Sequence, residues 1–207
     1  GKNLLVTKAV KNVLCELEGS PAFEAYSKYL NIQNDSFFFQ NTLEFPLFYY
    51  ENGEICLRSP MACSDEGALL LASDIETGAV VRIAYGDPQS IMESVRQGTI
   101  RVSNFCPEGI QMYSSMARLS FWGDADVGKE TEPFQSIAPT FGFYASGEFM
   151  RAQSFVGLYN ACIVVAAMRE GEPNHSLQKC AVVGDGTRAG KVSIISRLAN
   201  FTNVSSA

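Results

Sequence analysis

Histidine is almost absent from this sequence of 207 residues, in which His175 is the single example. A serine or cysteine nucleophile needs a base within hydrogen-bonding reach. His175 lies in a polar connector that contains Pro173 and Asn174, beyond the apolar segments that would build a core. We therefore expect this histidine to be exposed to solvent and not to activate a nucleophile.

Paired carboxylates are the remaining candidates for acid–base catalysis. Glu130 and Glu132 follow Asp124 and Asp126 closely in the sequence. An acidic run of this kind in a loop is usually solvated, so we expect no catalytic role for these side chains. The sequence therefore favours a protein that is not an enzyme.

Close pairs of cysteines are also missing, because no CxxC motif occurs. Cysteine in an apolar context packs as a small hydrophobic residue. A zinc site needs clustered ligands, commonly two close pairs, so we expect reduced, mostly buried thiols and no metal or other cofactor. The six cysteines are far apart: Cys15, Cys56, Cys63, Cys106, Cys162 and Cys180.

The sequence lacks both an excess of positive charge and a membrane-spanning run. Its formal net charge is −6, which repels phosphate backbones, and nucleic acid is not an expected partner. No run approaches the roughly 18 apolar residues that suggest a membrane-spanning helix, and the start lacks the features of a signal peptide. We expect a soluble chain without membrane insertion.

Hydrophobic residues make up 46% of the chain and charged residues 18%. A chain of this length and composition can build one good core and is too rich in aromatics to be disordered. We therefore expect a single globular domain.

The first half reads as hairpins with a helix between them. Residues 4–10 and 12–19 alternate apolar and polar side chains around Asn12, which predicts an opening hairpin. Ser20 and Pro21 resemble a helix cap followed by a first helical residue, and a short amphipathic helix is expected after them. The pair Asn52–Gly53 predicts a tight type I′ hairpin. A second hairpin is expected from 67–75 to 79–86, with both strands covered on both faces.

The second half reads as one helix followed by strands. Asp87 and Pro88 predict a helix start, and Gly98 predicts its end, so this helix should cover the preceding sheet. Residues 109–116, 140–149 and 158–168 read as strands, the last of them central because it is almost wholly apolar. The sequence predicts an α+β fold with helices outside one or two largely antiparallel sheets.

From residue 172 the sequence becomes polar and rich in glycine. The run 182–191 misses the glycine spacing of both dinucleotide-binding and phosphate-binding loops, so a flexible linker is expected there. Ile194, Leu198 and Phe201 then form one apolar stripe of a predicted helix. Docking of this helix on its own domain remains the alternative to pairing with a partner helix.

The run TFGFYASGEF, residues 140–149, combines aromatics, glycines and one carboxylate. Glycine within a strand marks a bulge or the close approach of a ligand or another backbone. This run and three others, residues 17–30, 114–123 and 158–171, resemble the C-terminal domain of the FIST sensory module. The resemblance spans roughly residues 10–171.

The resemblance is carried by three short motifs of that family: a cysteine-x-x-arginine turn, a GFYTYGE-like strand and an asparagine-x-threonine start of the final strand. Two positions depart from the pattern, because Ser115 stands where cysteine is usual and Cys162 where threonine is common. Redox sensing through the motif cysteine is therefore not expected here. The positions that match are Arg118, Gly142, Phe143, Tyr144, Gly147, Glu148 and Asn160.

The resemblance implies a cytoplasmic sensory domain of bacterial signal transduction, covering residues 1–171. Residues 172–207 are then the linker and signalling helix to an output domain, such as a histidine kinase of a two-component system or a diguanylate cyclase of cyclic-di-GMP signalling. The expected partners are a small-molecule ligand, the N-terminal half of the same module, the output domain, and a second copy through the C-terminal helix.

The expected ligand-binding residues are Arg118, Glu148, Tyr144, Asn160 and Ser115. A guanidinium suits a carboxylate and a carboxylate suits an ammonium group, so an amino acid is the first candidate ligand. Arg118 could instead pair with a core carboxylate, Glu148 could cap a turn or form an internal salt bridge, and Asn160 could bind neighbouring backbone. Haem-based nitric-oxide sensing and a pure interaction module remain the alternative functions.

The apolar stripe of the tail generates a first prediction. Charged substitutions at Ile194 and Leu198 in the full-length protein should uncouple ligand binding from output, because they disrupt helix pairing outside the sensory core. Ligand affinity, measured by calorimetry, is expected to stay nearly unchanged while output activity loses its ligand dependence. Loss of affinity itself would show that the tail belongs to the folded core.

Overall fold

The computed structural model describes residues 1–51, 53–152 and 155–170. These residues form two compact units, 1–87 and 88–170, instead of the expected single core. The predicted linker and signalling helix, together with His175 and the glycine-rich run 182–191, lie outside the described residues.

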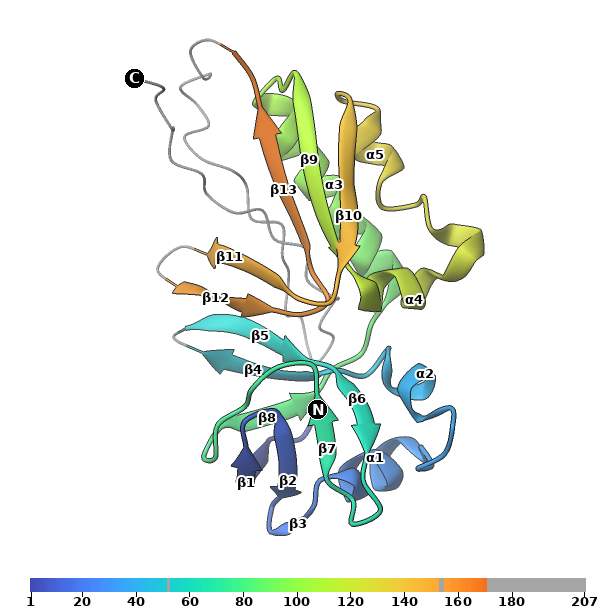
Figure 1. The fold of residues 1–207 in the computed structure, drawn as a ribbon, viewed down its shortest axis with the longest axis vertical. Coiled ribbons are helices and arrows are strands. Elements are labelled where there is room, and N and C mark those ends of the chain that lie inside the picture. Colours follow the sequence, from blue (N-terminus) through green and yellow to red (C-terminus); the bar gives the residue numbers. More distant parts are fainter. Residues whose placement is uncertain (52, 153–154, 171–207) are drawn as a thin grey trace. The chain divides into compact units, whose positions relative to one another are not determined.

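The N-terminal unit is built on one antiparallel sheet of eight strands (Figure 1). The strands follow the order β5-β4-β8-β1-β2-β7-β6, and β3 pairs with β2. Helix α1 (Phe23–Leu30) and the short helix α2 (Phe38–Thr42) complete the unit. The strands are β1 (Leu4–Val10), β2 (Val13–Leu17), β3 (Ser20–Pro21), β4 (Leu47–Glu51), β5 (Glu54–Arg58), β6 (Pro60–Cys63), β7 (Leu69–Leu71) and β8 (Val80–Ile83).

Two of the predicted hairpins are confirmed. Strands β1 and β2 pair antiparallel around the turn at Lys11 and Asn12. Strands β4 and β5 pair with Glu51 opposite Glu54, which leaves a two-residue turn, and Gly53 has a φ of 81°. A positive φ at this position is what a tight hairpin turn requires and what glycine allows.

The hairpin predicted between residues 67–75 and 79–86 is wrong. Strand β7 pairs with β2 and β6, whereas β8 pairs with β1 and β4. The segment before β8 bonds to β1 instead, because the Gly78 amide donates to the Val6 carbonyl at 2.8 Å. The strands are also covered on one face only, since Leu70 and Val80 are exposed. The opening hairpin thus lies between them in the sheet.

Helix α1 forms where the sequence predicts it, but its start differs. Ser20 and Pro21 belong to strand β3, and Ala22 precedes the helix without a side-chain capping bond. The backbone amide of Ala22 donates to the Cys15 carbonyl at 3.0 Å, so the chain pairs with β2 before it turns into the helix. Sheet pairing has therefore overridden the local capping signal.

The C-terminal unit contains a three-stranded sheet, a two-stranded hairpin and three helices (Figure 1). The order of the sheet is β10-β9-β13, and β11 pairs with β12. The elements are α3 (Pro88–Asn104), β9 (Gly109–Ser115), α4 (Met116–Asp126), α5 (Glu132–Gln135), β10 (Thr140–Ala145), β11 (Glu148–Ala152), β12 (Phe155–Tyr159) and β13 (Ile163–Met168).

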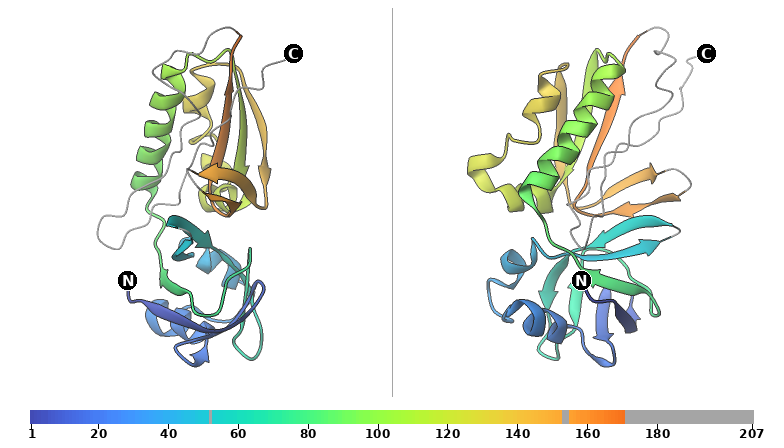
Figure 2. Two further views of the ribbon diagram at one scale, coloured as in Figure 1. Left: turned by 90° about the vertical axis from the view of Figure 1, so that its left-hand side faces the viewer. Right: turned by 180° about the vertical axis from the view of Figure 1, so that it is seen from behind.

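Helix α3 and the three-stranded sheet form two layers of this unit (Figure 2). Val95 and Val102 of the helix share a buried core with Ile110 of β9 and Ile163 of β13. The helix therefore covers the strands that follow it, not the preceding sheet as predicted. It also continues past Gly98, which is buried within the helix, so this glycine serves packing and does not end the helix.

The strand pattern of this unit departs from the prediction in two ways. The predicted strand 140–149 is divided into β10 and β11 at Ser146 and Gly147, and β10 runs parallel to β9. The apolar strand β13 lies at one end of the three-stranded order, with β9 in the centre. Helices beside largely antiparallel sheets nevertheless confirm the predicted α+β class.

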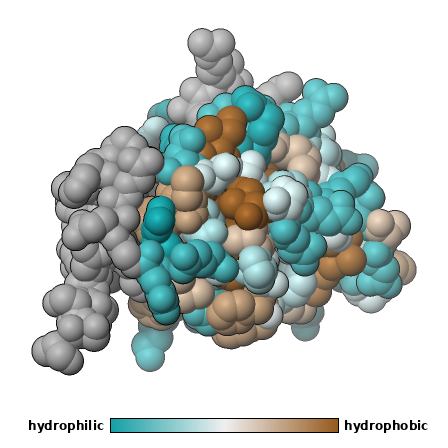
Figure 3. Space-filling model, turned by 90° about the horizontal axis from the view of Figure 1, so that it is seen from above, coloured by the Kyte–Doolittle hydropathy of each residue, from teal (hydrophilic) through white to brown (hydrophobic). Residues whose placement is uncertain are grey.

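None of the helices in the described part of the chain is long and apolar enough to cross a membrane. On the face of the molecule seen in Figure 3, hydrophobic residues are scattered among polar ones. Isolated exposed hydrophobic residues are normal on protein surfaces.

The glycine motif of β10 generates a stability prediction. A Cβ atom at Gly142 would lie 1.7 Å from the Met112 carbonyl oxygen of the neighbouring strand. The Gly142→Ala variant is therefore expected to lose more than about 2 kcal/mol of unfolding free energy. The measurement is urea unfolding followed by fluorescence of Trp122. Gly109→Ala, whose Cβ would meet only the Met168 side chain at 3.8 Å, is the matched control and should change little.

Candidate functional site

The predicted site residues gather at one edge of the C-terminal unit. Ser115 ends β9, and its backbone amide donates to the Cys162 carbonyl at 3.0 Å, next to the start of β13. Its side chain caps helix α4 by accepting from the Ala117 amide at 3.3 Å. The parallel strands β9 and β10 both end here, so their carboxyl ends face the same place, where ligands commonly bind in sheets with parallel strands.

Arg118 lies in the first turn of α4 and is 1% exposed. Its Nε donates to Glu130 Oε2 at 2.9 Å, and its Nη2 donates to Glu130 Oε1, which makes the pair bidentate. Its Nη1 donates to the Ala161 carbonyl at 3.1 Å. Such a fork satisfies a buried guanidinium and fixes its orientation.

Glu130 is a residue of this cluster that the sequence did not reveal. This residue is only 3% exposed, whereas the acidic run was expected to be solvated. A buried carboxylate needs a cationic partner, and Arg118 supplies it. In the sequence, nothing distinguishes Glu130 from the exposed acidic residues around it. Only the pairing of this segment with α4 reveals its role.

Glu148 begins strand β11 and is 3% exposed. The Cys162 thiol donates to its Oε2 at 3.1 Å. The Ser115 side chain lies near enough to this carboxylate to lower its pKa. Ser115 and Cys162 are therefore both polar neighbours of the same carboxylate.

Burial raises the pKa of Glu148 from 4.5 to about 7, because a charged carboxylate is poorly stabilised away from water. The hydrogen bonds from Cys162, the positive charge of Arg118 and the Ser115 side chain lower it, but they do not offset the burial. Glu148 can therefore change its charge near neutral pH.

Two buried oxygen atoms of the cluster have no hydrogen-bond partner among the described residues: Glu148 Oε1 and Asn160 Oδ1. Asn160 follows β12 and is 5% exposed. It lies beside Gly147, since a Cβ at that glycine would come within 3.8 Å of Asn160 Nδ2. Leaving a buried acceptor without a hydrogen bond costs roughly 1–3 kcal/mol of stability. A hydrogen bond donated by a ligand or by water to either oxygen would remove that cost.

Tyr144 lies at the rim of the cluster, near the end of β10. Its hydroxyl donates to the Val127 carbonyl at 3.4 Å, in the segment that follows α4. Burial and the negative charge of Glu130 raise the pKa of Tyr144, while Arg118 lowers it. The Tyr144 hydroxyl is therefore close enough to the buried ion pair to be affected by its charges. The structure thus brings all five predicted residues to one region of the unit.

Among the described residues, no group of three or more histidine, cysteine, aspartate or glutamate side chains could hold a metal ion. No disulfide links the five described cysteines, of which Cys56 and Cys162 are buried and Cys106 is exposed. The expectation that most cysteines are buried is wrong for these five, since Cys15 and Cys63 are half-buried. Cys180 lies outside the described residues.

The raised pKa of Glu148 generates a pH prediction. Its value is higher in the folded protein, about 7, than the ordinary 4.5, so folding favours the protonated form. The unfolding free energy should therefore fall as pH rises from 4.5 to above 7, by on the order of 3 kcal/mol. Glu148→Gln should remove this fall, because it cannot ionise. Urea unfolding monitored by Trp122 fluorescence at several pH values, with the exposed Glu132→Gln as control, tests it. An identical pH profile for Glu148→Gln and the unmodified protein would contradict it.

Comparison with known proteins identifies the family. The FIST C domain family matches residues 22–151, which is well over half of the chain. Neither the curated proteins nor the solved structures contain a significant match. The matched range includes Ser115, Arg118, Tyr144 and Glu148, and Asn160 lies nine residues beyond it. The chain belongs to the FIST C domain family of sensory domains in signal transduction.

Proposed function

We propose that this chain senses a small polar metabolite, with an amino acid as the first candidate, at the polar cluster of the C-terminal unit. The observation that carries the proposal is the pair of buried acceptors without partners, Glu148 Oε1 and Asn160 Oδ1. Membership of a sensory-domain family supports the general role in sensing. The polar cluster is the binding site that we propose.

The chemistry of the two acceptors favours a ligand with N–H donors. An unsatisfied carboxyl oxygen and an unsatisfied amide oxygen in one cluster suit an ammonium group, which carries three donors. Binding of a cation would also favour the ionised form of Glu148, whose pKa is raised to about 7 by burial. Ligand binding near neutral pH is therefore expected to release a proton.

Arg118 has a narrower role in this proposal than the one expected from sequence. Its guanidinium is already engaged by Glu130 and by the Ala161 carbonyl. A ligand carboxylate would have to share or replace Glu130 to reach it. Arg118 then acts chiefly as a positioning residue, since it fixes the Ala161 turn between Asn160 and Cys162.

The family also supports a wider setting as part of this proposal. The domain works in the cytoplasm beside the N-terminal half of the same module, and it passes occupancy to an output domain such as a histidine kinase or a diguanylate cyclase. Residues 172–207 provide the connection and the contact with a second copy. Strand β13 (Ile163–Met168), which begins next to Cys162 of the cluster, is the last described strand before that segment in the sequence.

Thermal unfolding in the presence of each standard amino acid tests the ligand class. A bound amino acid should raise the melting temperature in a concentration-dependent way, because it binds the folded state alone. The matching decarboxylated amine should retain part of the effect and the N-acetylated derivative should lose it. No stabilisation by any amino acid or amine would rule out this ligand class.

Two variants test whether the stabilising ligand binds at Glu148. Glu148→Gln removes the charge that would bind the ammonium group, and it should abolish the stabilisation by ligand. Glu132→Gln removes an exposed carboxylate of the same unit and should leave the stabilisation unchanged. Equal stabilisation of both variants would place the ligand elsewhere.

A further inference from the structure

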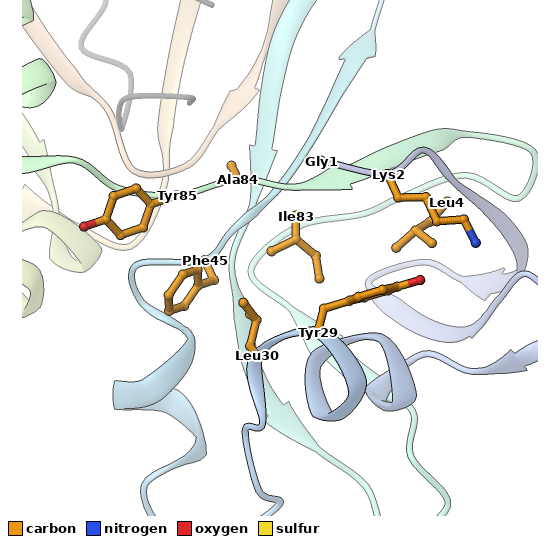
Figure 4. A pocket seen from close by; sticks show the side chains of 9 residues that line it. All are labelled: Gly1, Lys2, Leu4, Tyr29, Leu30, Phe45, Ile83, Ala84 and Tyr85. Atoms are coloured by element: carbon orange, nitrogen blue, oxygen red, sulfur yellow. The ribbon is translucent and has the colours of Figure 1, made fainter. Parts of the chain in front are cut away.

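A hollow lies within the N-terminal unit, far in sequence from the polar cluster. It is a pocket of about 250 Å³, and its walls come from the end of α1, the segment before β4, the end of β8 and the start of the chain. Figure 4 shows these side chains around one space. The five residues of the predicted ligand site are not among its lining residues.

Backbone hydrogen bonds fix the walls of this pocket. The Ala84 amide donates to the Pro46 carbonyl at 2.8 Å, and the Gly86 amide donates to the Glu44 carbonyl at 2.7 Å. The buried Tyr26 hydroxyl donates to the Phe45 carbonyl at 2.8 Å. The hollow is therefore formed before any ligand enters, which reduces the ordering cost of binding.

The lining is apolar and aromatic. Phe45 and Tyr85 stack at a tilt, with ring centroids 5.8 Å apart, and Leu4 and Ile83 provide aliphatic wall. The ring of Tyr29 is 47% exposed although it borders the pocket. Exposed rings around a preformed hollow offer apolar and stacking contacts to a planar molecule.

The charge at the pocket is positive, in a chain whose net charge is −6. Lys2 is the one lysine or arginine in the lining, and no carboxylate lines the pocket. A second lysine, Lys28, holds its Nζ 5.8 Å from the centroid of the Tyr29 ring. Figure 4 shows Lys2 and Tyr29 ending on the same side of the space, with Phe45 and Tyr85 towards the other. The pocket is thus cationic at one end and aromatic at the other.

We propose that this pocket binds a small aromatic carboxylate, with the ring between Ile83 and the aromatic side chains and the carboxylate beside Lys2. The size agrees, because an apolar cavity of about 150 Å³ holds benzene, and the extra space here fits a short acidic arm. The site is separate from the polar cluster, so the chain would respond to two chemically different small molecules.

Phenylpropionate is the probe that tests this proposal, with phenylpropanol as its neutral counterpart. Titration of the full isotope-labelled chain, followed by NMR, should shift the methyl signals of Leu4, Leu30 and Ile83 at a dissociation constant of about 1 mM or tighter. Phenylpropanol should bind more weakly. No shift of these signals, or shifts confined to residues 88–170, would overturn the proposal.

Three variants separate the contributions. Lys2→Gln should weaken phenylpropionate binding about fivefold at low salt and leave phenylpropanol binding unchanged. Tyr29→Ala removes an exposed wall and should weaken both probes. Lys11→Gln, an exposed lysine of the same unit outside the pocket, should alter neither. Equal affinity of the Lys2 and Lys11 variants for phenylpropionate would contradict the carboxylate site, whatever the outcome of the amino-acid tests on Glu148.

Discussion

The buried guanidinium of Arg118 is the constraint on which the C-terminal unit depends. Taking this charge out of water is costly, and the bidentate pair with Glu130 and the bond to the Ala161 carbonyl offset that cost. These bonds join three segments that are not neighbours in sequence: the start of α4, the loop before α5 and the turn between β12 and β13. Loss of either charged partner would leave the other buried without a counter-charge. The three segments therefore depend on this pair to stay together at the edge of the sheet.

That rigidity has a functional side. Asn160 and Cys162 flank the carbonyl that Arg118 holds, and Cys162 contacts Glu148. The ion pair therefore fixes the positions of the two acceptors that have no partner of their own. Supporting contacts of this kind hold the binding groups of a site in the geometry that a ligand requires. Ser115 and Cys162 place a hydroxyl and a thiol near the carboxylate of Glu148.

Local signals predicted what local interactions decide. The opening hairpin, the Asn52–Gly53 hairpin and the start of α3 agree with the sequence because turn residues and periodicity determine them. The partners of β7 and β8 could not be predicted, because an apolar pattern does not specify which strand pairs with which. The same holds for the site: motif residues brought Arg118 and Glu148 to attention, but the burial of Glu130 depends on a tertiary contact. The division into two units also follows from packing and not from composition.

The strand order of the N-terminal unit has a consequence for its folding. The β1–β2 hairpin is the first part of the sheet to be synthesised, yet it lies in the middle, between β8 and β7. Its outer neighbours follow only after residue 69 on one side and residue 80 on the other. Strand β3 covers part of the β2 edge at once, but the β1 edge of the hairpin stays open while about 60 further residues leave the ribosome. Closing such distant pairings is slow, so the nascent sheet is exposed to unwanted strand pairing at this stage more than at any later one.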